Sequence, residues 1–221
     1  RFWHDTRPTL RKAVEDRATQ VAASDVDYEI ETRLRAVKKE QPFAGIHVCP
    51  SSSLDVPDDQ AVRLVLLRPT DVYRASNPNN SAMTAVADIL NNRGTTPRIY
   101  RNMVAFVAPE QDLMLSLKQT VRRYLAWKSI KEDSEDLNLD AAQNRETDNN
   151  LARFNRAVDD QIKEAYCWLL IPYIDKATDL KTIIWDTIRI SGGSETIIGR
   201  AANKMQQNEQ IITRWAPALL K

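Results

Sequence analysis

The chain has 221 residues, of which 43% are hydrophobic and 28% are charged, as in ordinary globular proteins. This length allows one large domain or two small ones, and the composition excludes both a disordered chain and an integral membrane protein. The 31 basic and 30 acidic residues nearly cancel, so any nucleic-acid surface would have to be a local patch.

The first part of the chain predicts two helices. Apolar residues recur at helical spacing from residue 5 to residue 40, with a break near Ala23 and Ser24. Asp5 or Thr6 is a suitable N-cap because Pro8 follows in the first turn. The opening "RFWHDTRP" has neither an initiator Met nor a signal peptide, so we expect a piece of a longer polypeptide.

A βαβ unit is predicted next. The runs "FAGIHVCP" (43–50) and "AVRLVLLRP" (61–69) are apolar and closed by proline, which favours strands. A helix is predicted in "SAMTAVADILNNRG" (81–94), where Gly94 suits a C-cap, and a third strand in "NMVAFVAP" (102–109). Because such crossovers are right-handed, the last two strands should be parallel in an α/β fold.

The chain after Pro109 predicts a long helical hairpin. One amphipathic helix should run to the acidic stretch "KEDSEDLNLD". Asp140 and Gln143 have the spacing of a capping box, and we expect the second helix to begin there, to include Leu169 and to end at Pro172. The two helices should pack on the sheet or project from it.

The last segment changes character. The stretch "LKTIIWDTIRI" (180–190) alternates like a strand, and "SETIIGRAANKMQQNEQ" (194–210) predicts a helix with Ser194 as N-cap.

The predicted fold is a helix-rich α/β class with a small, mainly parallel sheet. We divide it into helices plus a sheet unit (1–110), the helical hairpin (111–176) and a small α+β segment (177–221), for which a winged helix is one alternative.

The strand-to-helix junction in "RNMVAFVAPEQDLMLSLKQTVRRYLAW" (101–127) has the order of a nucleotide site but lacks its residues. A P-loop needs glycines and a Lys-Ser/Thr pair. Here Pro109, Glu110 and Asp112 occupy the junction, and two carboxylates suit a helix start but repel an anion. The glycine-rich "SGGSETIIGRAANK" (191–204) fits neither a Walker motif nor GxGxxG and predicts a turn. We predict no catalytic residue.

The sequence also gives little support for a metal site or a reactive thiol. His4 and His47 are the only histidines, so a hydrolytic metal site lacks ligands, and Asp5 is better explained as a cap. The acidic residues Asp55, Asp58 and Asp59 could bind a divalent ion or cap a turn, and the turn is favoured. Cys49 and Cys167 have no CxxC companion, which predicts free thiols in a cytoplasmic protein.

Two sets of basic residues are candidates for phosphate. Arg93, Arg98 and Arg101 cluster in "NNRGTTPRIYRN" and could contact a nucleotide in a neighbouring domain, contact a nucleic-acid backbone, or lie in a solvated loop. The alternative nucleic-acid contact is a C-terminal set: Arg189, Arg200, Lys204 and Arg214.

Several stretches resemble the C-terminal half of a bacterial and archaeal family of large AAA+-type ATPases called domain of unknown function 499. They are "RFWHDTRPTLRKAVEDR", "FAGIHVCPSSSLDVPDDQAVRLVLLRP", "LNNRGTTPRIYRNMVAFVAPEQ", "RRYLAWKSIKED", "KEAYCWLLIP" and "RWAPALL". The resemblance implies a parent protein that uses ATP and Mg²⁺ at Walker motifs upstream, linked to anti-phage defence and encoded beside DNA methyltransferases. It transfers no catalytic residue.

The resulting first hypothesis is a non-catalytic C-terminal region that holds no cofactor itself. Its expected partners are the upstream P-loop domain of the same polypeptide, DNA, and a methyltransferase or other defence protein. Two alternatives stay open: a nucleic-acid-binding module, and an interaction scaffold that uses the hairpin of residues 112–171. No membrane partner is expected, because the apolar runs are far shorter than the roughly 20 residues that span a bilayer.

Overall fold

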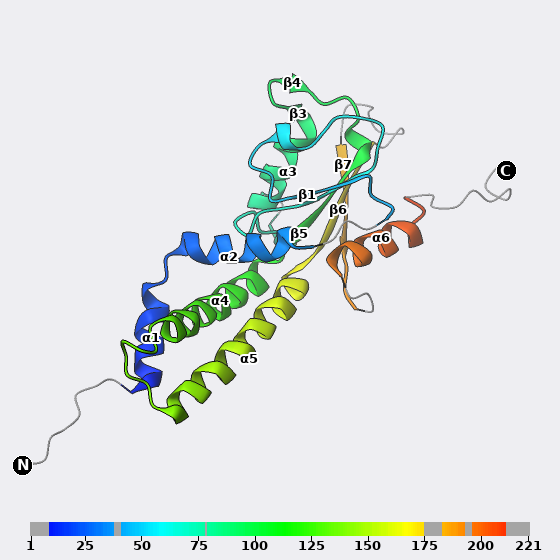
Figure 1. Cartoon of the computed structure of the whole chain (residues 1–221). Coiled ribbons are helices and arrows are strands. Elements are labelled where there is room, and N and C mark those ends of the chain that lie inside the picture. The colour runs from blue at the N-terminus through cyan, green and yellow to red at the C-terminus, as the bar shows by residue number, and fades with distance from the viewer. Residues whose placement is uncertain (1–8, 38–40, 78, 175–182, 193–195, 211–221) are drawn as a thin grey trace, which may run out of the picture.

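A computed structural model describes the chain apart from residues 1–8, 38–40, 78, 175–182, 193–195 and 211–221. The described residues form a five-stranded sheet with helices on both faces (Figure 1). The helices are α1 (Leu10–Gln20), α2 (Ala23–Arg35), α3 (Ser81–Asn91), α4 (Gln111–Glu132), α5 (Ala141–Ala165) and α6 (Ile197–Gln207). None of these described helices is both long enough and apolar enough to cross a membrane.

The sheet has the order β1-β2-β5-β6-β7. Its strands are β1 (Gly45–Val48), β2 (Arg63–Leu66), β5 (Val104–Pro109), β6 (Tyr166–Ile174) and β7 (Ile183–Arg189). The first three are parallel, and β6 and β7 are antiparallel to their neighbours. The α/β class and the parallel β2-α3-β5 crossover are therefore confirmed.

The hairpin prediction is right at its start and wrong at its end. Asp140 caps α5 by accepting from the backbone N–H groups of Ala142 and Gln143, both at 2.8 Å, which confirms the capping box. The helix ends at Ala165, and the following apolar run is β6. Leu169 and Pro172 lie in that strand. Pairing with β5 stops at Leu170, so the missing N–H of Pro172 interrupts no bond on that side.

Several predicted caps are also wrong. The break between α1 and α2 falls at Val21 and Ala22, and α1 is capped by Thr9, whereas Asp5 and Thr6 lie outside the described residues. Helix α3 ends at Asn91, and Gly94, with φ +62°, serves a turn between the two-residue strands β3 (Asn92–Arg93) and β4 (Thr96–Pro97). The cap of α6 is Thr196, because its side chain accepts from Gly199 N at 2.9 Å; Ser194 lies outside the described residues.

Two separate apolar clusters matter for function. The larger one, the sheet core, lies between one face of the sheet and helices α2, α4, α5 and α6. Helix α3 covers the opposite face. The described part of the C-terminal segment belongs to this layer, because β7 pairs with β6 and α6 buries Ile197, Ile198, Ala201 and Met205 in the sheet core.

The second cluster lies away from the sheet. Val14, Ala126, Trp127 and Ile130 are buried there, with Leu151 and Phe154 packed against them. These residues belong to α1, the last part of α4 and the first part of α5. We call residues 10–20, 122–132 and 141–157 the helical arm, which extends away from the sheet in Figure 1.

Candidate binding site on the helical arm

Arg98 serves the fold and not a ligand. Its side chain is 0% exposed and donates to the carbonyl oxygens of Ile89 at 2.8 Å and of Val56 and Pro57 at 2.9 Å each. These carbonyls lie at the last turn of α3 and in the irregular segment after β1, where helix or sheet bonds do not use them. The prediction of a phosphate contact is therefore wrong for Arg98.

Asp58 completes this set of bonds around Arg98, which we call the arginine knot. Its carboxylate accepts from the backbone N–H groups of Ile99 and Tyr100, both at 2.8 Å, and lies 3.9 Å from Arg98 Nη1. Burial alone would raise the pKa of Asp58, but the two N–H donors and the Arg98 charge outweigh it, so the pKa is lowered. The carboxylate thus stays charged and holds the loop in place.

The neighbouring aspartates have similar local roles. Asp55 accepts from the N–H groups of Ser51 and Ser52, and Asp59 pairs with Arg63 at 2.5 Å. The turn interpretation is confirmed by these bonds. Within the described ranges, no three His, Cys, Asp or Glu side chains are placed to hold a metal ion together.

Arg93 and Arg101 do not converge with Arg98. Arg93 is exposed on β3, and Arg101 is half-buried in a 3-10 turn, η2 (Arg101–Met103), ahead of β5. The structure thus separates the predicted trio into one buried structural arginine and two surface residues. Contact of Arg93 and Arg101 with phosphate stays a prediction.

Two of the four C-terminal basic residues already bond to other groups of the chain. Arg189 pairs with Glu110 Oε2 at 2.9 Å, and Arg200 donates to the carbonyl oxygen of Lys163. Burial lowers the pKa of Arg200. Lys204 is half-buried on α6, and Arg214 lies outside the described residues. Nucleic-acid contact through this set also stays a prediction.

The junction of β5 and α4 presents a carboxylate where a phosphate site would present N–H groups. Glu110 occupies the N-cap position, yet its side chain makes no cap bond and instead reaches Arg189. The expected capping role of Glu110 is therefore wrong. Its ion pair ties the start of α4 to the end of β7.

A small hollow of about 60 Å³ lies at the carboxyl ends of β1 and β2, beside Ser51–Ser53, Arg68 and Asp88. The Ser51 and Ser52 N–H groups face this region but already donate to Asp55. The strand order also rises along the sheet without reversal, so the crevice that doubly wound folds use for ligands does not form.

Both cysteines are free, as predicted, and both are buried. Burial raises the pKa of Cys49 to about 12 and also raises the pKa of Cys167, next to the Glu110 carboxylate. Neither thiol therefore has the lowered pKa of a nucleophilic cysteine.

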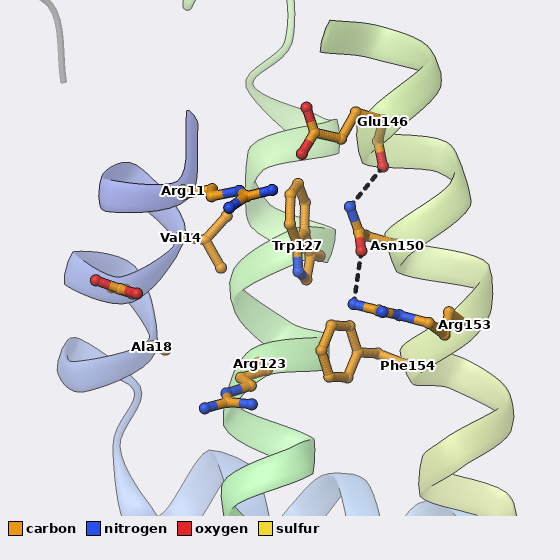
Figure 2. Close-up of a pocket in the computed structure, with 10 residues that line it drawn as sticks. Arg11, Val14, Ala18, Arg123, Trp127, Glu146, Asn150, Arg153 and Phe154 are labelled. Atoms are coloured by element: carbon orange, nitrogen blue, oxygen red, sulfur yellow. Dashed lines mark hydrogen bonds between the residues drawn. The ribbon is translucent and has the colours of Figure 1, made fainter. Parts of the chain in front are cut away.

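A larger hollow of about 420 Å³ lies on the helical arm (Figure 2). Three helices line it: α1 with Arg11, Val14, Glu15 and Ala18, α4 with Arg123 and Trp127, and α5 with Glu146, Asn150, Arg153 and Phe154. Figure 2 shows the side chains of Arg11 and Arg153 pointing toward Trp127 from opposite sides. We call this feature the arm groove.

The arm groove combines an apolar floor with available positive charge. The Arg153 guanidinium lies 4.8 Å from the centre of the Phe154 ring and donates to Asn150 Oδ1 at 2.8 Å, while Asn150 donates to the Glu146 carbonyl at 2.9 Å. Among the described residues, Arg11, Arg123 and Arg153 form no ion pair. The groove can therefore hold an apolar group against Val14, Trp127 and Phe154 and an anionic group beside it.

Polar clamps hold the walls of the arm groove in place. Arg17 of α1 donates to Ser129 Oγ and to Asp133 Oδ2, both at 2.6 Å, at the end of α4. Lys131 pairs with Asp148 of α5 at 2.7 Å.

The sequence prediction missed this site. Its available signal was the stripe of Arg11, Val14, Glu15 and Ala18 along one face of the first helix.

Comparisons with family models, curated proteins and solved structures found no match to this chain.

Proposed function

We propose that this chain is a non-catalytic binding module of a larger ATP-dependent protein, with the helical arm as its docking element. The observation that carries the proposal is the arm groove, where three guanidinium groups that make no ion pair with the described residues line an apolar floor on three helices. Mixed apolar and charged grooves of this kind suit protein recognition. The resemblance to the domain of unknown function 499 ATPases supports the ATP-dependent parent.

The connection between arm and sheet supports a mechanical role. Helix α4 begins directly after β5, and α5 ends directly before β6, the antiparallel neighbour of β5. The backbone bond from Glu110 N to Ala165 O, at 2.8 Å, closes the base of the hairpin. A load on the arm would thus reach the middle of the sheet through continuous, hydrogen-bonded elements.

ATP turnover tests the non-catalytic part of the proposal. Phosphate release by the purified 221-residue chain, with ATP and Mg²⁺, should equal the buffer background. The parent polypeptide would supply the P-loop. Turnover that elutes together with the chain and follows its concentration would contradict the proposal.

A nucleic-acid-binding module is the second candidate, because exposed Arg93 and half-buried Arg101 have no ion pair among the described residues. Fluorescence anisotropy with duplex and single-stranded DNA tests it at low and high salt. Binding that weakens with salt and is lost in an Arg93→Ala/Arg101→Ala variant would favour this candidate. Absence of binding at micromolar protein would remove it.

A further inference from the structure

We propose that the arm groove receives a short amphipathic helix of a partner protein, with apolar residues facing its floor and acidic residues beside them. This inference rests on the proposed docking role of the arm and adds the chemistry of the partner. It follows from the shape of the groove, the order of its lining residues and the signs of its charges.

The shape of the groove fits a helix. Helices α1 and α5 each pack along α4, and the groove runs between them with Trp127 of α4 in its floor (Figure 2). A fourth helix laid there would contact all three, as in a four-helix bundle. Helix-in-groove recognition uses this arrangement, with apolar anchors at helical spacing.

The lining residues set the length of the occupant. Helix α1 contributes residues from Arg11 to Ala18, and α5 contributes residues from Glu146 to Phe154, each at steps of one helical turn. At 1.5 Å per residue these stripes are about 10 to 12 Å long, which is two turns of helix. The partner segment therefore presents two or three apolar side chains to the groove.

The charges that line the groove determine which sign of charge the partner should carry. Arg11, Arg123 and Arg153 have no acidic partner among the described residues, so carboxylates on the occupant would gain ion pairs without breaking existing ones. Glu15 and Glu146 also line the groove and would repel a continuous polyanion. A helix that combines a few separate carboxylates with apolar residues suits this pattern better than nucleic acid does.

A peptide titration tests this inference with the full chain. The probes are fluorescein-labelled helical peptides of about 14 residues, or four turns, with a leucine stripe flanked by glutamates. A matched set has lysine in place of glutamate, and fluorescein-labelled oligothymidine is the nucleic-acid probe. Anisotropy should show that a glutamate peptide binds at micromolar concentration, more tightly than the other two probes.

Groove variants assign the binding to this site. Arg11→Glu/Arg153→Glu should weaken the glutamate peptide at least about tenfold and improve the lysine peptide. Ala18→Trp fills the groove without a charge change and should also weaken binding. Arg145→Glu, on α5 like Arg153 but outside the groove, is the control for charge reversal and should leave binding unchanged. Circular dichroism verifies that each variant is folded.

Three results would overturn the inference: no binding by any glutamate peptide, equal loss in Arg145→Glu and the groove variants, or tighter binding of lysine peptides or oligothymidine. None of them depends on ATP turnover. Failure of the peptide test therefore leaves the non-catalytic proposal standing, and turnover by the chain alone would contradict that proposal without touching the peptide result.

Discussion

The loop around Arg98 and the helical arm use the same side chain in opposite ways. Arg98 is fully buried and bonded to four backbone carbonyl oxygens, including that of Ser53, whereas Arg11 and Arg153 lie at the surface of the arm groove. The difference comes from the backbone. Carbonyls in the segment after β1 and at the end of α3 lack regular partners and accept from the Arg98 guanidinium, while Arg11 and Arg153 are exposed on α1 and α5. Arg11 and Arg153 make no ion pair among the described residues and thus stay available to a partner.

The largest effect should come from the floor of the arm. Trp127 is 5% exposed and packs in the cluster that α1, α4 and α5 share. Trp127→Ala should lower the free energy of unfolding by about 3 to 5 kcal/mol, since it empties a large buried volume. Guanidinium-induced unfolding followed by circular dichroism measures this. A loss below about 1 kcal/mol would contradict the assignment of Trp127 to a packed arm core.

The arginine knot should rank next. Arg98→Met keeps much of the apolar stem but removes the donors of the bonds to these carbonyl oxygens, so we expect a loss of about 3 kcal/mol. Arg93→Met is the control in the same loop and should change stability by less than about 0.5 kcal/mol, because Arg93 is exposed. Equal losses in the two variants would show that the loop does not depend on Arg98.

Acid should weaken the arginine knot. The pKa of Asp58 is lowered in the folded chain, so its contribution is present above the unfolded value of about 3.9 and is lost as pH falls below it. Asp58→Asn should cost about 1 kcal/mol at neutral pH, and the difference from wild type should shrink in acid. Urea unfolding at several pH values measures this. A difference that is independent of pH would contradict it.

The smallest effect on stability should come from the arm arginines. Arg11→Glu and Arg123→Glu should each change the free energy of unfolding by less than about 0.5 kcal/mol, because neither makes an ion pair within the described residues. Thermal unfolding of each variant measures this, with Arg17→Glu as a comparison that breaks the bonds to Ser129 and Asp133. A large loss in Arg11→Glu would mean that the residue supports the fold.

Local patterns in the sequence predicted most of the fold. Periodicity and proline breaks located β1, β2, α3 and β5, and the Asp140 and Gln143 spacing located the start of α5. The end of α5 was not predictable in this way, because Leu169 fits a helical repeat while the run from Tyr166 onward is buried on both faces as a strand. Tertiary pairing with β5 and β7 decides that boundary.

The candidate site was harder to predict than the fold. Arginine spacing singled out the loop that contains Arg98, but spacing does not reveal which carbonyls lack a partner. Conversely, Arg11, Arg123 and Arg153 lie far apart in sequence and meet only because α1 and α5 both pack on α4. A site assembled from three helices leaves only weak one-face stripes in each of them.

Amide hydrogen exchange of the whole chain, with and without the best-binding glutamate peptide, tests the central claim most directly. We predict that the peptide slows exchange in the helical arm, at residues 10–20, 122–132 and 141–157, and leaves the loop of residues 92–101 unchanged. Slower exchange in that loop, or no change in the arm, would contradict the assignment of the arm groove as the docking surface.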